Sequence, residues 1–217
     1  MLKSLYPHID WDSVRVAGFD LDGTLYDEAE FITQVYEPIS GRLATACGAG
    51  QADIHEWMLR RWLEKGSSYN RIFGEVLTRH GITGPVADAV IDECLSLFRE
   101  FRPALTLPVR VSAVLDLMSE QFSLFLVSDG SAALQTEKIR ALGLNRWFSP
   151  ENVGISGCHG PGFAKPATRI IGTIGALKCG TSQAEAVYFG DREVDAQFAS
   201  AAGFQYIRVS CMIPLAR

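Results

Sequence analysis

The hexapeptide Asp-Leu-Asp-Gly-Thr-Leu, which begins at Asp20, carries two carboxylates two residues apart. At the end of a strand this spacing projects both side chains to the same side. One carboxylate can attack a phosphorus atom to give an acyl phosphate, while the other handles protons. A close like charge raises the pKa of one member of such a pair, so we predict that Asp22 is protonated and acts as a general acid. The alternative is an ordinary Asp-Gly turn after a strand.

Two further segments supply groups that can hold an anion. Ser128, Asp129 and Gly130 precede a helical pattern, so the serine hydroxyl and the following backbone N–H groups can bind a phosphate oxygen at a helix N-terminus. A serine in this place can also be only a helix N-cap. Lys165 precedes Pro166, which can start a helix, and its ammonium would supply a local cation. A solvated surface lysine is the alternative reading.

A fourth segment, Gly-Asp-Arg-Glu-Val-Asp, ends at Asp195. Its two aspartates, Asp191 and Asp195, are four residues apart and would share one helical face. Together with Asp20 and Asp22 they would gather four like charges, and an oxygen-rich site of this kind suits Mg²⁺. Capping of the helix by Asp191, with Asp195 exposed, is the alternative.

These segments lie at or just beyond the ends of short apolar runs that predict buried parallel strands. The predicted strands are Val14–Leu21, Phe122–Val127, Ala186–Phe189 and Phe204–Val209. Helical patterns lie between them, over Val109–Ser119, Ala132–Leu142, Ala167–Leu177 and Val194–Ala202. The alternation predicts an α/β fold with a Rossmann-like parallel sheet flanked by helices. Such sheets build their sites at the C-terminal ends of the strands.

Residues 27–103 interrupt this alternation with helical periodicity and no convincing strand. In Asp53–Lys65, for example, apolar residues recur at helical spacing along one face. We predict an inserted all-helical cap domain over 27–103, and a discontinuous core domain made of residues 1–26 and 104–217.

Composition narrows the class of protein. The 217 residues are 47% hydrophobic and 21% charged, which is typical of a folded globular chain. The net charge of −5, with Lys and Arg scattered, argues against nucleic acid as a partner. Five widely spaced cysteines without a C-x-x-C pair suggest neither a disulfide framework nor a zinc site. We find no signal peptide or membrane span in the sequence and expect a cytoplasmic protein.

In this order, the four segments resemble motifs I to IV of the haloacid dehalogenase superfamily: FDLDGTL, LVSDGS, AKP and VYFGDREVD. The resemblance continues through QTEKIRALGL, which contains Gln135 and Lys138, and through AAGF, so it covers most of the core from Arg15 to Val209. It is to the subfamily with a helical cap between motifs I and II, which includes phosphoglycolate phosphatase and pyrimidine nucleotidase-like enzymes. The cap itself matches by position and helical character only.

The resemblance implies a catalytic and metal-binding role for each acidic residue. Asp20 would be the nucleophile and a Mg²⁺ ligand. Asp22 would be the general acid and base, and would lend its backbone carbonyl to the metal. Asp191 would be the third protein ligand, with Asp195 ligating the metal or orienting the site.

The resemblance also assigns the groups that bind the transferring phosphoryl group. Ser128, Asp129, Gly130 and Lys165 would form the substrate-binding site. Ser128 and Lys165 would also be catalytic residues, and Lys165 would restrain the nucleophile. Two residues depart from the family pattern. Asp129 replaces a common Asn, so we expect its side chain to point away or bond elsewhere, and Arg192 stands where a small residue is common.

A member of this subfamily would be a Mg²⁺-dependent phosphomonoesterase acting on a small phosphorylated metabolite, such as a sugar phosphate, a nucleoside monophosphate or phosphoglycolate. Asp22 argues against a dehalogenase, because dehalogenases of the superfamily lack an acid there. Two alternatives remain: a phosphomutase or phosphotransferase using the same chemistry, and a non-catalytic regulatory protein that retained the fold. We expect a monomer or homodimer with neither nucleic acid nor membrane as a partner.

Overall fold

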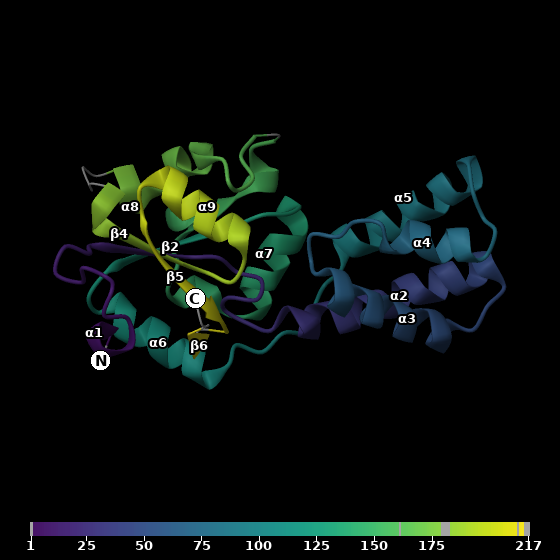
Figure 1. The fold of residues 1–217 in the computed structure, drawn as a ribbon, viewed down its shortest axis with the longest axis horizontal. Coiled ribbons are helices and arrows are strands. Elements are labelled where there is room, and N and C mark those ends of the chain that lie inside the picture. The colour runs from purple at the N-terminus through teal and green to yellow at the C-terminus, as the bar shows by residue number, and fades with distance from the viewer. Residues whose placement is uncertain (1, 161, 179–182, 212, 215–217) are drawn as a thin grey trace. The chain divides into compact units, whose positions relative to one another are not determined.

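The structure of the chain is a computed structural model. It describes residues 2–160, 162–178, 183–211 and 213–214. The chain divides into two compact units, which we describe separately (Figure 1). The core unit comprises Met1–Glu28 and Ala104–Arg217, and the cap unit comprises Ala29–Pro103.

The core unit is built on a sheet whose described strands are parallel except at one edge. These strands are β1 (Val16–Phe19), β2 (Ser123–Ser128), β3 (Val153–Ile155), β4 (Ala186–Gly190), β5 (Gln205–Ser210) and β6 (Ile213–Pro214). Their order is β3-β2-β1-β4-β5-β6, and β6 pairs antiparallel with β5. Strand β1 therefore lies between β2 and β4. The central strand is the one that leads into Asp20.

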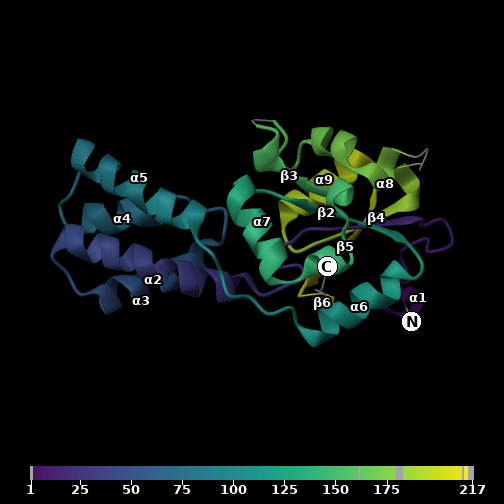
Figure 2. The same ribbon diagram turned by 180° about the vertical axis from the view of Figure 1, so that it is seen from behind.

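Helices cover both faces of this sheet. The α-helices are α1 (Leu2–Leu5), α6 (Val109–Ser119), α7 (Ala132–Ala141), α8 (Gly175–Lys178) and α9 (Glu193–Ala202). Short 3₁₀ helices span Leu144–Arg146, Pro150–Asn152, Ser156–Cys158, Thr168–Thr173 and Gln183–Glu185. Helices α8 and α9 lie on one side of the sheet and α6 on the other (Figures 1 and 2). This arrangement confirms the predicted α/β fold with a parallel sheet flanked by helices.

Strand β1 is buried along its whole length, as expected of a central parallel strand covered on both faces. Its Gly18 has no side chain, and the ring of Phe125 from β2 fills the space. A Cβ atom built on Gly18 would lie 2.1 Å from that ring. Close packing therefore requires glycine here, two residues before Asp20.

We expect Gly18→Ala to destabilise the protein, because either the Phe125 ring or the strand must move. Overpacking of a buried core costs about 1–3 kcal/mol. Gly172→Ala is the matched control, since nothing lies within 4 Å of the Cβ position at Gly172. Its effect should stay within about 0.5 kcal/mol. Urea unfolding measures both variants, and equal midpoints would show that the contact with Phe125 does not constrain the fold.

Two predictions about local structure in the core unit are wrong. The helix predicted over Ala167–Leu177 is instead the 3₁₀ helix Thr168–Thr173 followed by the short α8. This segment is rich in β-branched residues and is interrupted by Gly172, and both features disfavour a continuous α-helix. Pro166 does not start a helix, because Ala167 lies between it and the 3₁₀ helix. Strands β3 and β6 were not predicted, since such short strands give almost no periodic signal.

The cap unit contains the helices α2 (Glu28–Cys47, whose first residue belongs to the core unit), α3 (Gln51–Lys65), α4 (Ile72–Arg79) and α5 (Pro85–Glu100). Apolar side chains such as Met58 and Leu77 are fully buried among them. A bidentate ion pair joins α3 to α4. Arg61 Nε lies 2.6 Å from one carboxylate oxygen of Glu75, and Arg61 Nη2 lies 2.7 Å from the other. The cap unit thus has a small core and a polar link of its own.

Among the described helices, none is long and apolar enough to cross a membrane. The described cysteines are free thiols: Cys47, Cys94, Cys158 and Cys211. Cys94 and Cys211 are buried, whereas Cys158 is exposed. Cys179 lies outside the described residues.

Candidate active site

The parallel register of the sheet brings three predicted site residues to one edge. Asp20 directly follows β1, Ser128 ends β2, and Asp191 directly follows β4. Phe19 of β1 pairs in register with residues near the ends of both neighbouring strands. The C-terminal ends of the three strands therefore meet, and this is the edge at which open parallel sheets bind ligands.

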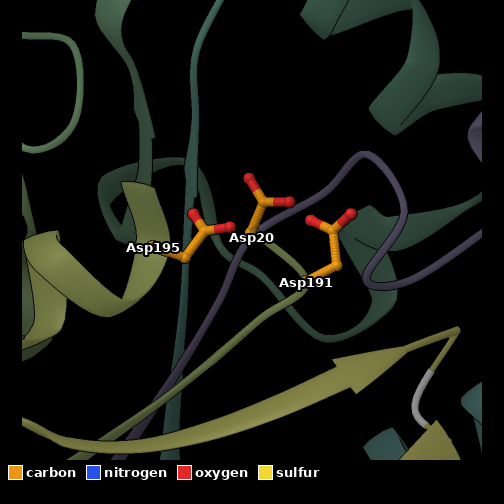
Figure 3. Close-up of side chains that lie close together, drawn as sticks. All are labelled: Asp20, Asp191 and Asp195. Carbon is orange, nitrogen blue, oxygen red and sulfur yellow. The ribbon is translucent and has the colours of Figure 1, made fainter. Parts of the chain in front are cut away.

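Three carboxylates gather at this edge. Asp20, Asp191 and Asp195 each offer one oxygen, and these oxygens lie within 4.8 Å of one another (Figure 3). Asp191 Oδ1 is buried and has no hydrogen-bond partner among the described residues. Gly23 leaves room for this carboxylate, because a Cβ atom there would lie 2.4 Å from Asp191 Oδ2. A buried oxygen without a hydrogen bond in a carboxylate cluster fits a hard divalent cation such as Mg²⁺.

Lys165 holds two of these carboxylates together. Its ammonium nitrogen lies 2.5 Å from Asp20 Oδ1 and 2.5 Å from Asp195 Oδ1, and its side chain is 0% exposed. The second oxygen of Asp195 accepts a hydrogen bond of 3.1 Å from the backbone N–H of Arg192. Both oxygens of Asp195 are therefore engaged by the protein. Of the two roles expected for Asp195, this arrangement favours orienting the site.

Burial controls the protonation of this cluster. Burial raises the pKa of Asp20 to about 7, although the neighbouring Lys165 ammonium lowers it. Burial likewise raises the pKa of Asp191 to about 6. For Lys165, burial favours the neutral form, but Asp20 and the other negative groups around it, among them Asp195, together outweigh burial and raise the pKa well above its usual value. A bound divalent cation would favour the ionised form of both carboxylates.

The side chain of Asp22 does not join the other three carboxylates, so the predicted gathering of four is wrong. Its Oδ1 lies 2.6 Å from the ammonium of Lys138 and also accepts a hydrogen bond from the Tyr26 hydroxyl. Burial alone would raise the pKa of Asp22, but Lys138 and Tyr26 lower it below its usual value. The predicted order is thus reversed in the free protein: the raised pKa belongs to Asp20. Any metal contact from Asp22 would come from its backbone carbonyl.

Ser128 does not cap a helix, and its buried hydroxyl is left without a hydrogen bond in the described part of the chain. The N-cap of α7 is Ser131, whose side chain accepts a hydrogen bond of 3.4 Å from Leu134 N. The capping alternative for Ser128 is therefore wrong, and its hydroxyl remains available for a phosphoryl oxygen.

Asp129 and Gly130 have partners within the protein. The carboxylate oxygens of Asp129 accept from the backbone N–H of Lys165, at 3.1 and 3.2 Å. Asp129 therefore bonds elsewhere, as expected of a negative charge beside an anion site, and it fixes the backbone that carries Lys165. The N–H of Gly130 donates to Ser156 Oγ at 3.3 Å. That N–H group is thus engaged, and the expectation that it contacts the anion is not supported by this geometry.

Comparison with known proteins identifies the family. The sequence pattern of the haloacid dehalogenase-like hydrolases matches residues 14–203. The chain belongs to this family. A relative from Methanopyrus kandleri, named glyceraldehyde 3-phosphate phosphatase, is 29% identical over an alignment of 206 residues that covers 90% of this chain and 84% of that protein. The resemblance of the four motifs is therefore confirmed, and the chain is a hydrolase of this family.

Solved structures of haloacid dehalogenase-like hydrolases share the fold. A subfamily IA, variant 1 hydrolase from Geobacter sulfurreducens superposes with a TM-score of 0.68 at 22% identity, covering 94% of this chain and 90% of that one. A hydrolase from Bacillus subtilis that was solved bound to magnesium gives a TM-score of 0.62 at 20% identity, with coverage of 94% and 90%. At this level of identity the likeness establishes the fold.

Two buried hydroxyl groups in the site of this haloacid dehalogenase-like hydrolase were missed from the sequence. Thr24 Oγ1 donates to Asp20 Oδ2 at 3.2 Å, so each oxygen of the candidate nucleophile has a partner. The Tyr188 hydroxyl lies 3.5 Å from Lys165 Nζ. Thr24 lies in the first motif, FDLDGTL, and Tyr188 lies in the fourth, VYFGDREVD. Their places within these motifs were the only sequence signal for a role in the site. Arg192 Nε lies 3.7 Å from Asp191 Oδ1, so this unusual arginine stands beside the carboxylate cluster.

Proposed function

We propose that this haloacid dehalogenase-like hydrolase is a Mg²⁺-dependent phosphomonoesterase that acts on a small phosphate ester through an aspartyl phosphate on Asp20. One observation carries the proposal: the buried Asp20 carboxylate lies within one cluster with Asp191 and is held by the Lys165 ammonium. Asp22 and the unpartnered hydroxyl of Ser128 stand at the same strand ends. The name of the Methanopyrus kandleri relative supports a phosphatase of the sugar phosphate type. The magnesium-bound Bacillus subtilis structure supports the choice of cation.

In the proposed reaction, Asp20 attacks the phosphorus atom, the bond between phosphorus and the ester oxygen breaks, and the leaving oxygen takes a proton from Asp22. Water then attacks the phosphorus of the aspartyl phosphate, gives a proton to Asp22, and releases inorganic phosphate with Asp20 restored. Lys165 and Ser128 stabilise the charge on the transferring group. Mg²⁺, which Asp20 and Asp191 would hold, supplies further neutralisation of that charge.

The proton of Asp22 in the first step requires a change from the free protein, in which its pKa is lowered. A bound phosphate dianion adds negative charge at the strand ends and therefore raises the pKa of a neighbouring carboxyl group. The substrate itself thus favours the protonated form that donates to the leaving oxygen.

Phosphate release from a panel of small esters tests this function. We expect Mg²⁺-dependent turnover of at least one sugar phosphate, nucleoside monophosphate or phosphoglycolate, and loss of turnover in excess chelator that added Mg²⁺ restores. Ca²⁺ should restore it poorly, because it favours more ligands at longer distances than Mg²⁺. Turnover that is unchanged in chelator would contradict the metal. Transfer of phosphate to a second sugar phosphate, without release, would favour the phosphotransferase alternative.

A further inference from the structure

Helix α7 carries two polar side chains on a buried face. Gln135 and Lys138 are three positions apart, so they project from one side of the helix. They are 3% and 2% exposed. Lysine is almost never buried to this degree without a partner, because an isolated charge in the protein interior is very costly. Lys138 is paired with the carboxylate of Asp22, 116 residues earlier in the chain.

Three donors converge on this carboxylate, two from helix α7 and one from Tyr26, four residues after Asp22. Lys138 Nζ lies 2.6 Å from Asp22 Oδ1, to which the fully buried Tyr26 hydroxyl also donates. Gln135 Nε2 lies 3.3 Å from Asp22 Oδ2. Both oxygens of Asp22 are thereby held, and an ion pair with this many hydrogen bonds fixes one orientation of the side chain.

The same amide connects Asp22 to the loop after β2. Gln135 Nε2 lies 3.0 Å from the backbone carbonyl oxygen of Asp129, which directly follows Ser128. Gly130 leaves room for this contact, because a Cβ atom there would lie 2.6 Å from Gln135 Nε2. Gln135 therefore joins the carboxylate that handles protons to the backbone beside the residue that would hold the phosphoryl group.

We propose that Lys138, Gln135 and Tyr26 form a clamp that fixes the Asp22 carboxylate for proton transfer, with Lys138 as its principal member. The proposal rests on the proposed function, in which Asp22 protonates the leaving oxygen. Lys138 is a positioning residue: it acts on the leaving oxygen only through Asp22. A purely structural lysine would instead support all substrates alike.

Leaving groups distinguish these two roles. An alkoxide leaves poorly without a proton, whereas p-nitrophenolate leaves without one, so only the alkyl ester depends strongly on Asp22. The parameter kcat/KM covers the steps up to departure of the leaving group. We expect Lys138→Met, which keeps the length of the side chain and removes its charge, to lower kcat/KM for glycerol 3-phosphate by about 10²-fold. The loss for p-nitrophenyl phosphate should stay below about tenfold.

Two further variants complete the experiment. Tyr26→Phe removes only one hydroxyl of the clamp, and should lower kcat/KM for glycerol 3-phosphate by about tenfold with little change for p-nitrophenyl phosphate. It carries the test if Lys138→Met does not fold. Lys178→Met removes an exposed lysine and should leave both substrates unchanged. Equal losses for the two esters in Lys138→Met and Tyr26→Phe would overturn the clamp alone. If the wild type prefers another alkyl ester of the panel, that ester replaces glycerol 3-phosphate in this comparison. A wild type that hydrolyses no phosphate ester would overturn the proposed function, and the clamp with it.

Discussion

Asp20→Asn is expected to lower kcat/KM by more than about 10⁴-fold for every phosphate ester that the wild type hydrolyses. The amide oxygen is a poor nucleophile and a weaker ligand for a divalent cation. The shape of the side chain is unchanged, and the Lys165 ammonium keeps its contact with Asp195, which lies at 2.5 Å. The variant should therefore fold. Phosphate release under saturating Mg²⁺, together with thermal unfolding, measures both parts of this expectation.

Asp10→Asn makes the same chemical exchange at an exposed position and should retain wild-type turnover. An Asp20→Asn variant that is folded and keeps more than about a tenth of wild-type activity would exclude covalent catalysis by this residue. A loss of similar size in both variants would point to a general effect on the preparation and not to the nucleophile.

Lys165→Met is expected to damage both activity and stability. It removes the cation that a phosphoryl group would contact, a change that costs about 10²–10³-fold in kcat for comparable electrostatic donors. It also leaves the carboxylates of Asp20 and Asp195, both at most 1% exposed, without their shared partner. Breaking a buried ion pair by removing one member costs about 3–5 kcal/mol. Urea unfolding in chelator, alongside phosphate release with Mg²⁺, measures the two effects.

The stability loss in Lys165→Met should depend on pH with a defined sign. In the folded wild type the pKa of Asp20 is about 7, above its ordinary value of 3.8. Between these two values the folded protein binds more protons than the unfolded one, so this group makes stability fall as pH rises. Since Lys165 lowers the pKa of Asp20, its removal extends the fall to higher pH. The deficit of the variant should therefore be larger at pH 8 than at pH 5.

Lys178→Met serves as the control at an exposed site, and its unfolding midpoint should match the wild type at both pH values. If the loss of stability in Lys165→Met grew as pH falls, the buried carboxylates would not depend on the charge of Lys165, which would contradict this explanation. Retention of full activity would remove Lys165 from the proposed phosphoryl-binding groups.

The sequence patterns predicted the architecture because the central strands of the sheet are recognisable as short, continuous apolar runs. Strand β1 is a continuous apolar run directly followed by Asp20, which is the usual pattern of a parallel strand buried on both faces. Strand β3 could not be found in this way, because a three-residue strand at the edge of the sheet shows no usable period. The α-helix predicted over Ala167–Leu177 was wrong because its apolar residues recur at helical spacing, whereas its β-branched residues and Gly172 disfavour a continuous α-helix.

For the site, the residues at strand ends were predictable and their partners were not. Asp20, Ser128 and Asp191 meet because parallel strands end at one edge, which is a rule that sequence patterns can use. The protonation order of Asp20 and Asp22 was predicted wrongly because it depends on Lys138, whose contact with Asp22 spans 116 residues. A contact between residues so far apart in the sequence exists only in the folded chain, so local sequence patterns could not predict it.

Direct observation of the aspartyl phosphate tests the central claim. The wild type, mixed with Mg²⁺ and its best ester for a few milliseconds and quenched in acid, should carry one phosphoryl group. Peptide mass spectrometry should place that group on Asp20, and Asp20→Asn under the same conditions should carry none. Steady turnover by an enzyme that never carries phosphate, or phosphate found on a residue other than Asp20, would contradict the account.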